Sequence, residues 1–281
     1  MERIEDIGQM QQKADAYRRS GKRIGFVPTM GYLHEGHLSL MDEAKKDCDI
    51  LVVSIFVNPA QFGPNEDYTT YPRDLFRDEA LAESRGADII FYPSAEAMYP
   101  HEQLAWVNVE KITDVLCGAQ RPGHFRGVAT VVTKLFNIVK PHLAVFGQKD
   151  AQQVAVIMKM TEDLNMDVQI RIAPVMREAD GLAMSSRNIG LTPEDRKHAL
   201  ILSQVLFSIR DGIREGEEIE ALLKMSRDRI ASVPNVRLEY LETRTFPELE
   251  PLHTFSRDCL IAVAARFGKV RLIDNVLLKK T

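Results

Sequence analysis

Cysteine is scarce in this sequence of 281 residues. Cys48, Cys117 and Cys259 stand far apart and are odd in number, so they indicate neither a disulfide framework nor the clustered pairs of a zinc motif. An apolar signal core is also missing behind residues 1–6. We therefore expect a protein of a reducing compartment, with the cytoplasm as the default localisation.

Long apolar runs and a basic surplus are missing as well. The longest apolar stretches, such as residues 50–57, fall far short of the roughly 18–20 residues that span a bilayer. The formal net charge is −4, whereas proteins that bind nucleic acid by neutralising phosphates show a basic surplus or stripe. The sequence thus predicts no membrane and no nucleic acid as partner, and it favours small-molecule ligands.

The residues that are present describe a globular core. Hydrophobic residues make up 45% of the chain and charged residues 27%, as in soluble globular proteins. Residues 50–57 form a near-continuous apolar run, which is typical of a strand covered on both faces and hence of a parallel sheet. Strand and helix patterns alternate up to residue 174, which predicts an α/β fold with an open, Rossmann-like parallel sheet.

Hydrophobic periodicity and glycine or proline punctuation place the elements of this first part. Strands are expected at residues 23–27, 50–57, 87–92, 143–146 and 168–173, with a shorter one at 106–109. Helices are expected at residues 6–20, 34–45, 72–86 and 128–139, and residues 117–125 are expected to form a loop. A further helix should bury Val154, Ile157, Met158 and Leu164.

The pattern changes after Pro174. Thr192 and Pro193 form a strong helix start, and we expect helices at residues 193–213 and 217–232. Strand-like runs follow at residues 236–240, 259–265 and 270–273. The sequence therefore predicts two domains, residues 1–174 and a smaller α+β domain at residues 175–281.

The stretch Val27–Leu38 runs from an apolar strand through a glycine turn into a helix. His34 and His37 are three residues apart, so both imidazoles lie on one face of its first turn. Backbone N–H groups and the positive dipole end favour an anion such as phosphate there, and Gly31 and Gly36 permit close approach of a ligand. A nucleotide fits this pattern, while ordinary helix surface and half of a metal site remain alternatives.

Two polar loops follow other expected strands. Gln61 offers an amide that can hold a small polar substrate, and Lys149, after Gly147, can reach phosphate oxygens. Because ligands bind beyond the carboxyl ends of strands in open α/β sheets, we expect these loops and the histidine turn to meet at one crevice. A solvated surface lysine is the alternative for Lys149.

Three further polar groups have ordinary explanations beside functional ones. Asp150 and Gln153 have the spacing of a helix cap, which alone would explain both. Residues 184–188 place two hydroxyls and a guanidinium on a loop that can close over a triphosphate, or that is plain loop material. A basic cluster fits an anion, a solvated loop or a subunit contact; its members are Arg121, His124 and Arg126.

Together, four of these motifs closely resemble the pantothenate synthetases, also called pantoate:beta-alanine ligases. Residues 27–38, 54–62, 147–150 and 184–188 match that family in order and spacing, and the resemblance covers essentially the whole chain. Residues 34–37 resemble the H-x-G-H signature of the wider nucleotidyl-transferase superfamily. Residues 184–187 resemble its mobile K-M-S-K-S loop.

The resemblance implies an ATP-dependent condensation of pantoate with beta-alanine. The products would be pantothenate, AMP and pyrophosphate, formed through a pantoyl-adenylate intermediate. Mg²⁺ would arrive with ATP and bridge its phosphates. The family also implies a homodimer formed through the N-terminal domain, and the second domain would act as a lid that protects the intermediate from water.

The resemblance also implies residues for ATP. His34 and His37 would bind the phosphates, with His37 as a candidate proton donor, while Lys149 would hold phosphate and Asp150 the ribose. Met176 would contact the adenine. The residues implied for ATP binding are Met30, Gly31, His34, Gly36, His37, Gly147, Gln148, Lys149, Asp150, Met176, Met184, Ser185, Ser186 and Arg187.

For the acid substrate, the resemblance implies that Gln61 and Gln153 bind pantoate, with Gln61 bordering beta-alanine. The implied catalytic set is His34, His37, Lys149, Ser185, Ser186 and Arg187. Asp78 matches an acidic position that some members place near the metal, whereas Arg77 stands where some carry a second carboxylate.

Two other functions remain open from the residues alone. A nucleotidyl transferase would share the histidine turn but release an adenylylated product. A non-catalytic nucleotide-binding module would bind ATP and stop there. A tRNA-charging synthetase is disfavoured by the length and acidic balance of the chain.

Overall fold

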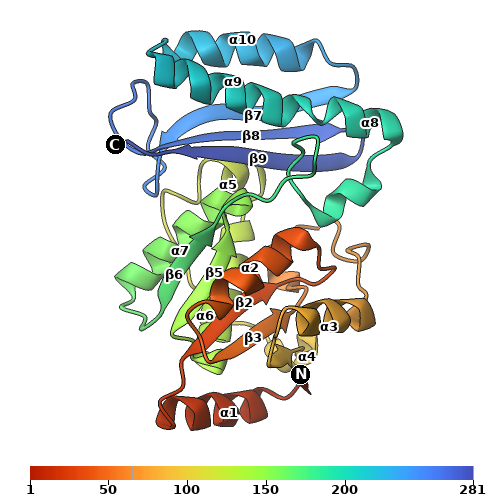
Figure 1. Ribbon diagram of the computed structural model, residues 1–281, viewed down its shortest axis with the longest axis vertical. Coiled ribbons are helices and arrows are strands. Elements are labelled where there is room, and N and C mark those ends of the chain that lie inside the picture. The colour runs from red at the N-terminus through yellow and green to blue at the C-terminus, as the bar shows by residue number, and fades with distance from the viewer. Residues whose placement is uncertain (65, 281) are drawn as a thin grey trace. The chain divides into compact units, whose positions relative to one another are not determined.

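The computed structural model describes residues 1–64 and 66–280, which form two compact units. The first unit comprises Met1–Glu110, Arg121–Gly147 and Val156–Pro174. The second comprises Lys111–Gln120, Gln148–Ala155 and the chain from Val175 onward. Figure 1 follows the chain from the red N-terminus to the blue C-terminal strands.

The first unit is built on a parallel sheet with strand order β1-β4-β3-β2-β5-β6. Every residue of β3 is buried, as expected for a strand covered on both faces. Strand order reverses between β2 and β5, and ligands of open α/β sheets bind beyond the carboxyl ends at such a point. The strands are β1 (Glu2–Ile4), β2 (Ile24–Thr29), β3 (Ile50–Ile55), β4 (Ile89–Phe91), β5 (Leu143–Gly147) and β6 (Gln169–Ala173).

Neighbouring side chains of the central strands point to opposite faces of this sheet. On one face, Val27 lies in an apolar cluster with Leu38 of α2 (Glu35–Lys45). On the other, the rings of Phe26 and Phe146 make edge contacts with Phe136 of α6 (His124–Val139), at centroid distances of 6.4 and 6.5 Å. Helices thus cover both faces, and polar groups collect at the strand ends.

The other helices complete these layers. α1 (Ile7–Arg19) packs on α6, and α3 (Leu75–Ser84) contacts α2. The short turn η1 (Pro59–Gln61) follows β3 and contacts α6, while α4 (Ala95–Met98) follows β4. α7 (Ala151–Asp163) begins in the second unit and continues in the first. Among the helices of residues 1–64 and 66–280, none combines the length and apolar character needed to cross a membrane.

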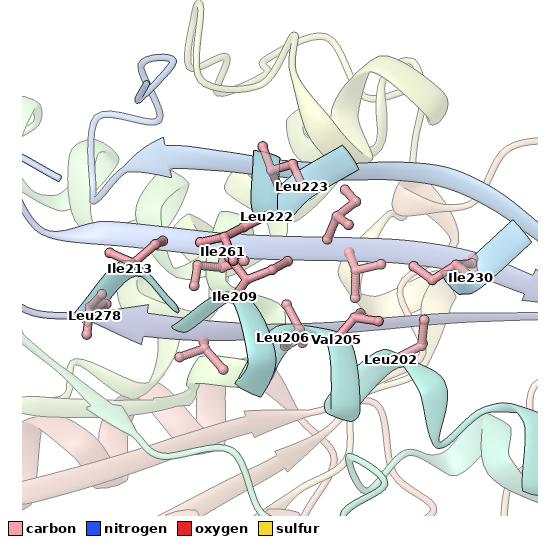
Figure 2. Close-up of a cluster of buried hydrophobic side chains, with 14 of the residues drawn as sticks. Leu202, Val205, Leu206, Ile209, Ile213, Leu222, Leu223, Ile230, Ile261 and Leu278 are labelled. Carbon is pink, nitrogen blue, oxygen red and sulfur yellow. The ribbon is translucent and has the colours of Figure 1, made fainter. Parts of the chain in front are cut away.

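The second unit contains an antiparallel sheet with strand order β7-β8-β9. Helices α9 and α10 pack on one face, and their leucine, isoleucine and valine side chains form the core drawn in Figure 2. Ile261 points into this core, whereas Leu260 joins Leu116 on the other face. The elements are α5 (Leu116–Gln120), η2 (Gln148–Asp150), η3 (Ser186–Gly190), α8 (Pro193–His198), α9 (Ile201–Glu215), α10 (Ile219–Ala231), β7 (Val236–Thr245), β8 (Cys259–Phe267) and β9 (Val270–Leu278).

The predicted fold class is confirmed, but the strand predicted at residues 106–109 is wrong. Val107 donates its backbone N–H to Oγ1 of Thr130 in α6, at 3.0 Å, instead of to a strand. The guanidinium of Arg126 lies over the Trp106 ring, 4.6 Å from its centroid. This segment is therefore bound to a helix surface.

The loop predicted at residues 117–125 is also wrong, because α5 and the start of α6 occupy most of it. The Cys117 backbone N–H donates to Oε1 of Gln152, which holds α5 in place. Gly123, with φ of +81°, allows the chain to turn into α6.

Other boundaries shift for local reasons. The helix predicted at residues 193–213 is divided into α8 and α9, because Leu200 and Leu202 bond to carbonyls three residues back. The helix predicted at residues 72–86 begins at Leu75, where the Asp74 side chain caps it. Leu164 is 52% exposed, contrary to expectation, because α7 ends one residue earlier.

Candidate active site

The turn after β2 is stabilised by two side chains, which accept hydrogen bonds from three successive backbone N–H groups. Gly31 donates to Oγ1 of Thr29 at 3.1 Å. Tyr32 and Leu33 donate to the two carboxylate oxygens of Asp78, each at 2.7 Å. Gly31 and Tyr32 both have positive φ, +84° and +52°, a conformation that glycine adopts readily and other residues rarely. The turn therefore depends on these bonds.

His34 and His37 close the turn into α2 with their own rings. Nδ1 of His34 accepts the Gly36 N–H at 3.1 Å, and Nδ1 of His37 accepts the His34 N–H at 3.3 Å. The two rings lie with centroids 4.1 Å apart. Because both Nδ1 atoms accept, a neutral ring carries its proton on Nε2. The histidines are thus set as Nε2–H donors at a helix N-terminus, where the dipole favours an anion.

Asp78, the candidate metal position, has its carboxylate inside the first unit and is only 1% exposed. Burial raises the pKa of this carboxyl above its usual value, although the bonds from Leu33 and Tyr32 and the nearby charge of Arg77 favour the ionised form. Within the part of the chain that the structure describes, no group of three or more His, Cys, Asp or Glu residues is placed to hold a metal ion.

Gln61 ends η1 with its amide orientation defined. Nδ2 of Asn58 donates to Oε1 of Gln61 at 3.0 Å, and Nε2 of Gln61 lies 3.2 Å from Sδ of Met30. The Tyr99 hydroxyl donates to Oδ1 of Asn58 at 2.8 Å, and burial raises the pKa of Tyr99 to about 12. This network directs the NH₂ group of Gln61 toward Met30. The parts that Asn58 and Tyr99 play in it were not predicted from the sequence.

The backbone of η1 lies directly against α6. A Cβ added at Gly127 would come within 2.2 Å of the Ala60 carbonyl oxygen, so glycine is required for this contact. His124 also reaches this turn, since its Nδ1 lies 2.8 Å from the Gln61 carbonyl oxygen. The signal in the sequence was only a glycine directly before the helix expected at residues 128–139, which does not identify the residue that it contacts.

The basic cluster of residues 121–126 has internal partners. Nε of Arg121 donates to Oε1 of Glu66 at 2.7 Å, and Nη1 of Arg121 lies 3.0 Å from Nε2 of His124. Burial opposes ionisation of Glu66, but the hydrogen bond and charge of Arg121 outweigh it and lower the pKa of Glu66. With Arg126 over Trp106, each member of the cluster has a partner within the first unit.

In the second unit, η2 consists of Gln148, Lys149 and Asp150. Asn275 of β9, which lies far along the chain, fixes this turn. Nδ2 of Asn275 donates to the carbonyl oxygens of Gln148 and Lys149, at 2.9 and 2.8 Å, and its Oδ1 accepts from Nε2 of Gln148 at 3.1 Å. Nζ of Lys149 lies 3.8 Å from Oδ1 of Asp150. Gln153 is half-buried near the start of α7.

The segment after Val175 folds back on itself. Met184 donates its backbone N–H to the Met176 carbonyl at 3.0 Å, which brings these two predicted nucleotide residues together. Arg177 makes a two-pronged ion pair with Asp274, with Nη1–Oδ2 at 2.6 Å and Nη2–Oδ1 at 2.9 Å. Asp274 is 3% exposed. For the two buried polar residues of β9, Asp274 and Asn275, the available sequence signal was an Asp-Asn pair directly after the strand expected at residues 270–273.

The serine-arginine segment begins η3. Oγ of Ser185 accepts the Arg187 backbone N–H at 3.2 Å, and Ser186 is buried. Nδ2 of Asn188 donates to Oε1 of Glu178 at 3.0 Å and to the Ala183 carbonyl at 3.1 Å. These bonds shape a segment that carries two hydroxyl groups and a guanidinium in succession, which are groups suited to phosphate oxygens.

Comparisons with known proteins extend over the whole chain. Residues 2–277 match the family model described as pantoate-beta-alanine ligase. The chain is 57% identical over 262 residues to the pantothenate synthetase of Pelotomaculum thermopropionicum, covering 93% of each chain. It is 53% identical over 280 residues to that of Heliobacterium modesticaldum, covering 99% of this chain and 100% of that one.

Solved structures agree. The pantothenate synthetase of Thermus thermophilus matches with a TM-score of 0.93 and 44% identity, covering 98% of this chain and 99% of that one. The pantoate-beta-alanine ligase of Francisella tularensis, solved as a complex with beta-gamma ATP and beta-alanine, matches with a TM-score of 0.83 and 36% identity. That match covers 99% of this chain and 97% of the other.

Proposed function

Because the chain belongs to the pantoate-beta-alanine ligase family, we propose that it joins pantoate to beta-alanine with ATP, giving pantothenate, AMP and pyrophosphate. The enzyme is an amide-forming ligase. The observation that carries the assignment to this site is the pair of Nδ1-anchored imidazoles at the start of α2, which supports phosphate binding by two Nε2–H donors.

The reaction has two steps. A pantoate carboxylate oxygen attacks the α-phosphorus of ATP, and the bond from that phosphorus to the pyrophosphate oxygen breaks. The amine of beta-alanine then attacks the acyl carbon, AMP leaves, and the amine loses a proton. In the first step negative charge builds on phosphate oxygens, and positioned donors stabilise such a transition state.

In the first unit, His34 and His37 donate to the phosphates, and His37 is the candidate proton donor. Met30, Gly31 and Gly36 line the nucleotide. The closely held N–H groups of the turn support this role, because donors fixed before the reaction need little reorganisation during it. Gly147, at the end of β5, completes the residues of this unit that are assigned to ATP.

In the second unit, Lys149 is assigned to phosphate and Asp150 to the ribose, with Gln148 beside them. Met176 is assigned to the adenine. The fixed geometry of η2 supports these assignments. The residues assigned to the triphosphate are Met184, Ser185, Ser186 and Arg187.

Pantoate is assigned to Gln61 and Gln153. The amide of Gln61 supports this assignment, since Asn58 occupies its carbonyl oxygen and leaves the NH₂ group oriented as a donor. A donor there suits the oxygens of a hydroxy acid. The position beside Gln61 is assigned to beta-alanine.

Magnesium enters this proposal as part of the substrate, bridging the phosphates of ATP. The described residues hold no ready metal cluster, and both oxygens of Asp78 already accept backbone N–H groups. Asp78 is also buried, at 1% exposure, so we assign no protein ligand to the ion, and no step passes through a protein-bound ion.

Three broader assignments complete the proposal. The enzyme acts in the cytoplasm, and the domain predicted at residues 175–281 excludes water from the adenylate. It is a homodimer through its N-terminal domain. Phe76 is 84% and Leu104 83% exposed in the first unit, so these two apolar side chains are the ones to replace in a test of the dimer. Sedimentation of wild type against a Phe76→Ser, Leu104→Ser double variant tests the dimer.

One assay separates the possible functions. The enzyme is incubated with ATP, Mg²⁺ and pantoate, pyrophosphate release is followed, and beta-alanine is then added. A ligase sustains AMP production only with the amine. A nucleotidyl transferase turns over without it, and a binding module releases no pyrophosphate; either result would contradict the proposal.

A further inference from the structure

We propose that Asp78 is a positioning residue that sets the histidine turn through its backbone, and that it is not a magnesium ligand. The inference rests on the proposed function of His34 and His37 as phosphate donors. The carboxylate of Asp78 bonds the backbone of the two residues that precede His34. Its action on the imidazoles therefore passes through the main chain of the turn.

The two carboxylate oxygens of Asp78 fix the backbone of the turn. Oδ2 and Oδ1 of Asp78 accept from Tyr32 and Leu33 at 2.7 Å, within the range of short bonds to charged acceptors. The two donors are consecutive, so the planar carboxylate fixes the orientation of two successive peptide groups. Tyr32 has φ of +52°, which costs energy for a residue with a side chain. The carboxylate therefore stabilises a conformation that the local sequence disfavours.

The carboxylate of Asp78 is closely packed against the turn. A Cβ added at Gly31 would lie 2.9 Å from Oδ2 of Asp78 and 2.9 Å from Cγ2 of Ile55. The turn, Asp78 and Ile55 thus leave no room even for a methyl group at Gly31, and Asp78, at 1% exposure, is out of contact with solvent. Arg77, the neighbouring residue, places its guanidinium 5.1 Å from the centroid of the Tyr32 ring and supplies the nearby positive charge.

The buried charge of Asp78 is compensated by its neighbours. Burying a carboxylate costs free energy unless its oxygens are hydrogen-bonded and its charge is compensated. Asp78 is 1% exposed, and Nη1 of Arg77, which carries the opposite charge, is 3.8 Å from its Oδ1. Its position in α3 does not require an acid, because Asp74 already caps that helix. The acidic side chain at position 78 instead stabilises the turn after β2, from which it accepts two backbone N–H groups.

The test compares Asp78→Asn with Asp74→Asn. Asparagine keeps the size of Asp78 but turns an NH₂ group toward one of the two donors, so the turn loses one bond. Asp74→Asn perturbs the same helix through its cap, where Asn serves almost as well as Asp. We expect Asp78→Asn to lower kcat for pyrophosphate release about 10- to 100-fold, with the KM for ATP nearly unchanged, and Asp74→Asn to retain the wild-type rate.

Magnesium dependence separates positioning from metal binding. For a positioning residue, the Mg²⁺ concentration at half-maximal rate stays at the wild-type value, and excess Mg²⁺ does not restore activity. A rise of about tenfold or more in that concentration, with recovery at high Mg²⁺, would overturn the proposal, since one lost ligand typically weakens a metal site by this factor or more.

A double-mutant comparison separates positioning from general damage. If Asp78 acts through His37, Asp78→Asn costs much less in a His37→Ala background than in wild type. Equal losses in both backgrounds would overturn the proposal. Should Asp78→Asn not fold, Asp78→Glu replaces it in the same comparison, because it keeps the carboxylate but moves its oxygens away from the two backbone N–H groups.

The ring nitrogens of His34 and His37 provide a readout that does not depend on activity, so the role of Asp78 can be tested separately from the proposed function. The ¹⁵N shifts of His34 and His37 report whether each Nδ1 still accepts a backbone N–H. We expect both to change in Asp78→Asn and neither in Asp74→Asn; unchanged shifts in Asp78→Asn would overturn the proposal. If wild type released no pyrophosphate with pantoate, the function would fail while this structural result stood.

Discussion

The backbone N–H of His34 lies 3.3 Å from Nδ1 of His37 and donates to it. The His37 ring therefore takes part in the helix cap through Nδ1, so the cap and the proposed phosphate contact through Nε2 depend on the same side chain. In a usual capping box, Glu or Gln stands at the position of His37. That difference allows the two roles to be separated by substitution.

We predict that His37→Ala lowers turnover about 10²-fold, the loss typical of one transition-state donor. His37→Gln should lose comparable activity while keeping a melting temperature closer to wild type, because glutamine restores the cap. Steady-state pyrophosphate release and thermal unfolding check both. A His37→Ala rate within a factor of about three of wild type would rule out the catalytic role on the same scale.

For Gln61→Ala, we expect the KM for pantoate to rise about tenfold or more, as for a lost bond to a charged group, with ATP binding nearly intact. The physical reason is that Asn58 occupies the carbonyl oxygen of this amide and leaves its NH₂ group, which is proposed to bind pantoate, oriented as a donor. Tyr99→Phe, which removes only the bond to Asn58, should show a smaller effect in the same direction. Equal loss for pantoate and ATP would mean that the loop is structural.

Replacing Asn275 with alanine removes the two donors that fix η2. We expect weaker ATP binding, measured by calorimetry, and a loss that is not additive with Lys149→Ala, since both act on one turn. Asn275→Asp is the matched variant: it keeps an acceptor for Gln148 but not the donors, and should be nearly as impaired. Full additivity with Lys149→Ala would contradict the link between the two residues.

Glu239 gives a pH-dependent stability. It lies at the irregularity of β7, and Oε1 and Oε2 accept from Arg266 and Arg271, at 2.8 and 2.7 Å, two cations that face each other across β8 and β9. Burial works to raise the pKa of Glu239, but the hydrogen bonds and charges of Arg271 and Arg266 outweigh it and hold the pKa below its ordinary value of 4.5. The stabilisation is therefore complete above that pH and is lost as pH falls through the lowered pKa.

Accordingly, Glu239→Gln should reduce the free energy of unfolding by about 3 kcal/mol at pH 7, the size of a broken buried pair. The difference from wild type should shrink below pH 4.5, because protonated glutamate resembles glutamine. Urea titrations of both proteins across this range measure it. A difference that stays constant with pH would show that Glu239 contributes through packing alone.

Periodicity predicted the fold because burial on both faces leaves a direct mark on β3 and its neighbours. His34 was recognisable as a helix start because a cap is a local feature. Asp78 acts on Leu33 from 45 positions away, and Asn275 on Gln148 from 127. Such contacts depend on how strands and helices pack, and no spacing rule contains them.

The predictions for short segments were wrong for a related reason. Residues 106–109 alternate like a strand, yet their polar backbone is satisfied by Thr130 of a helix. The requirement at Gly127 comes from the Ala60 carbonyl, which belongs to another element. In each case a tertiary partner decided the outcome, and local propensity did not.

The central claim, activation of pantoate by adenylation, is tested by isotope transfer. Pantoate labelled with ¹⁸O in both carboxylate oxygens is incubated with enzyme, ATP, Mg²⁺ and beta-alanine, and the products are analysed by mass spectrometry. The account predicts one ¹⁸O in the phosphate of AMP and one retained in pantothenate, with no label in AMP when unlabelled pantoate reacts in ¹⁸O water. AMP free of ¹⁸O from labelled pantoate would contradict it.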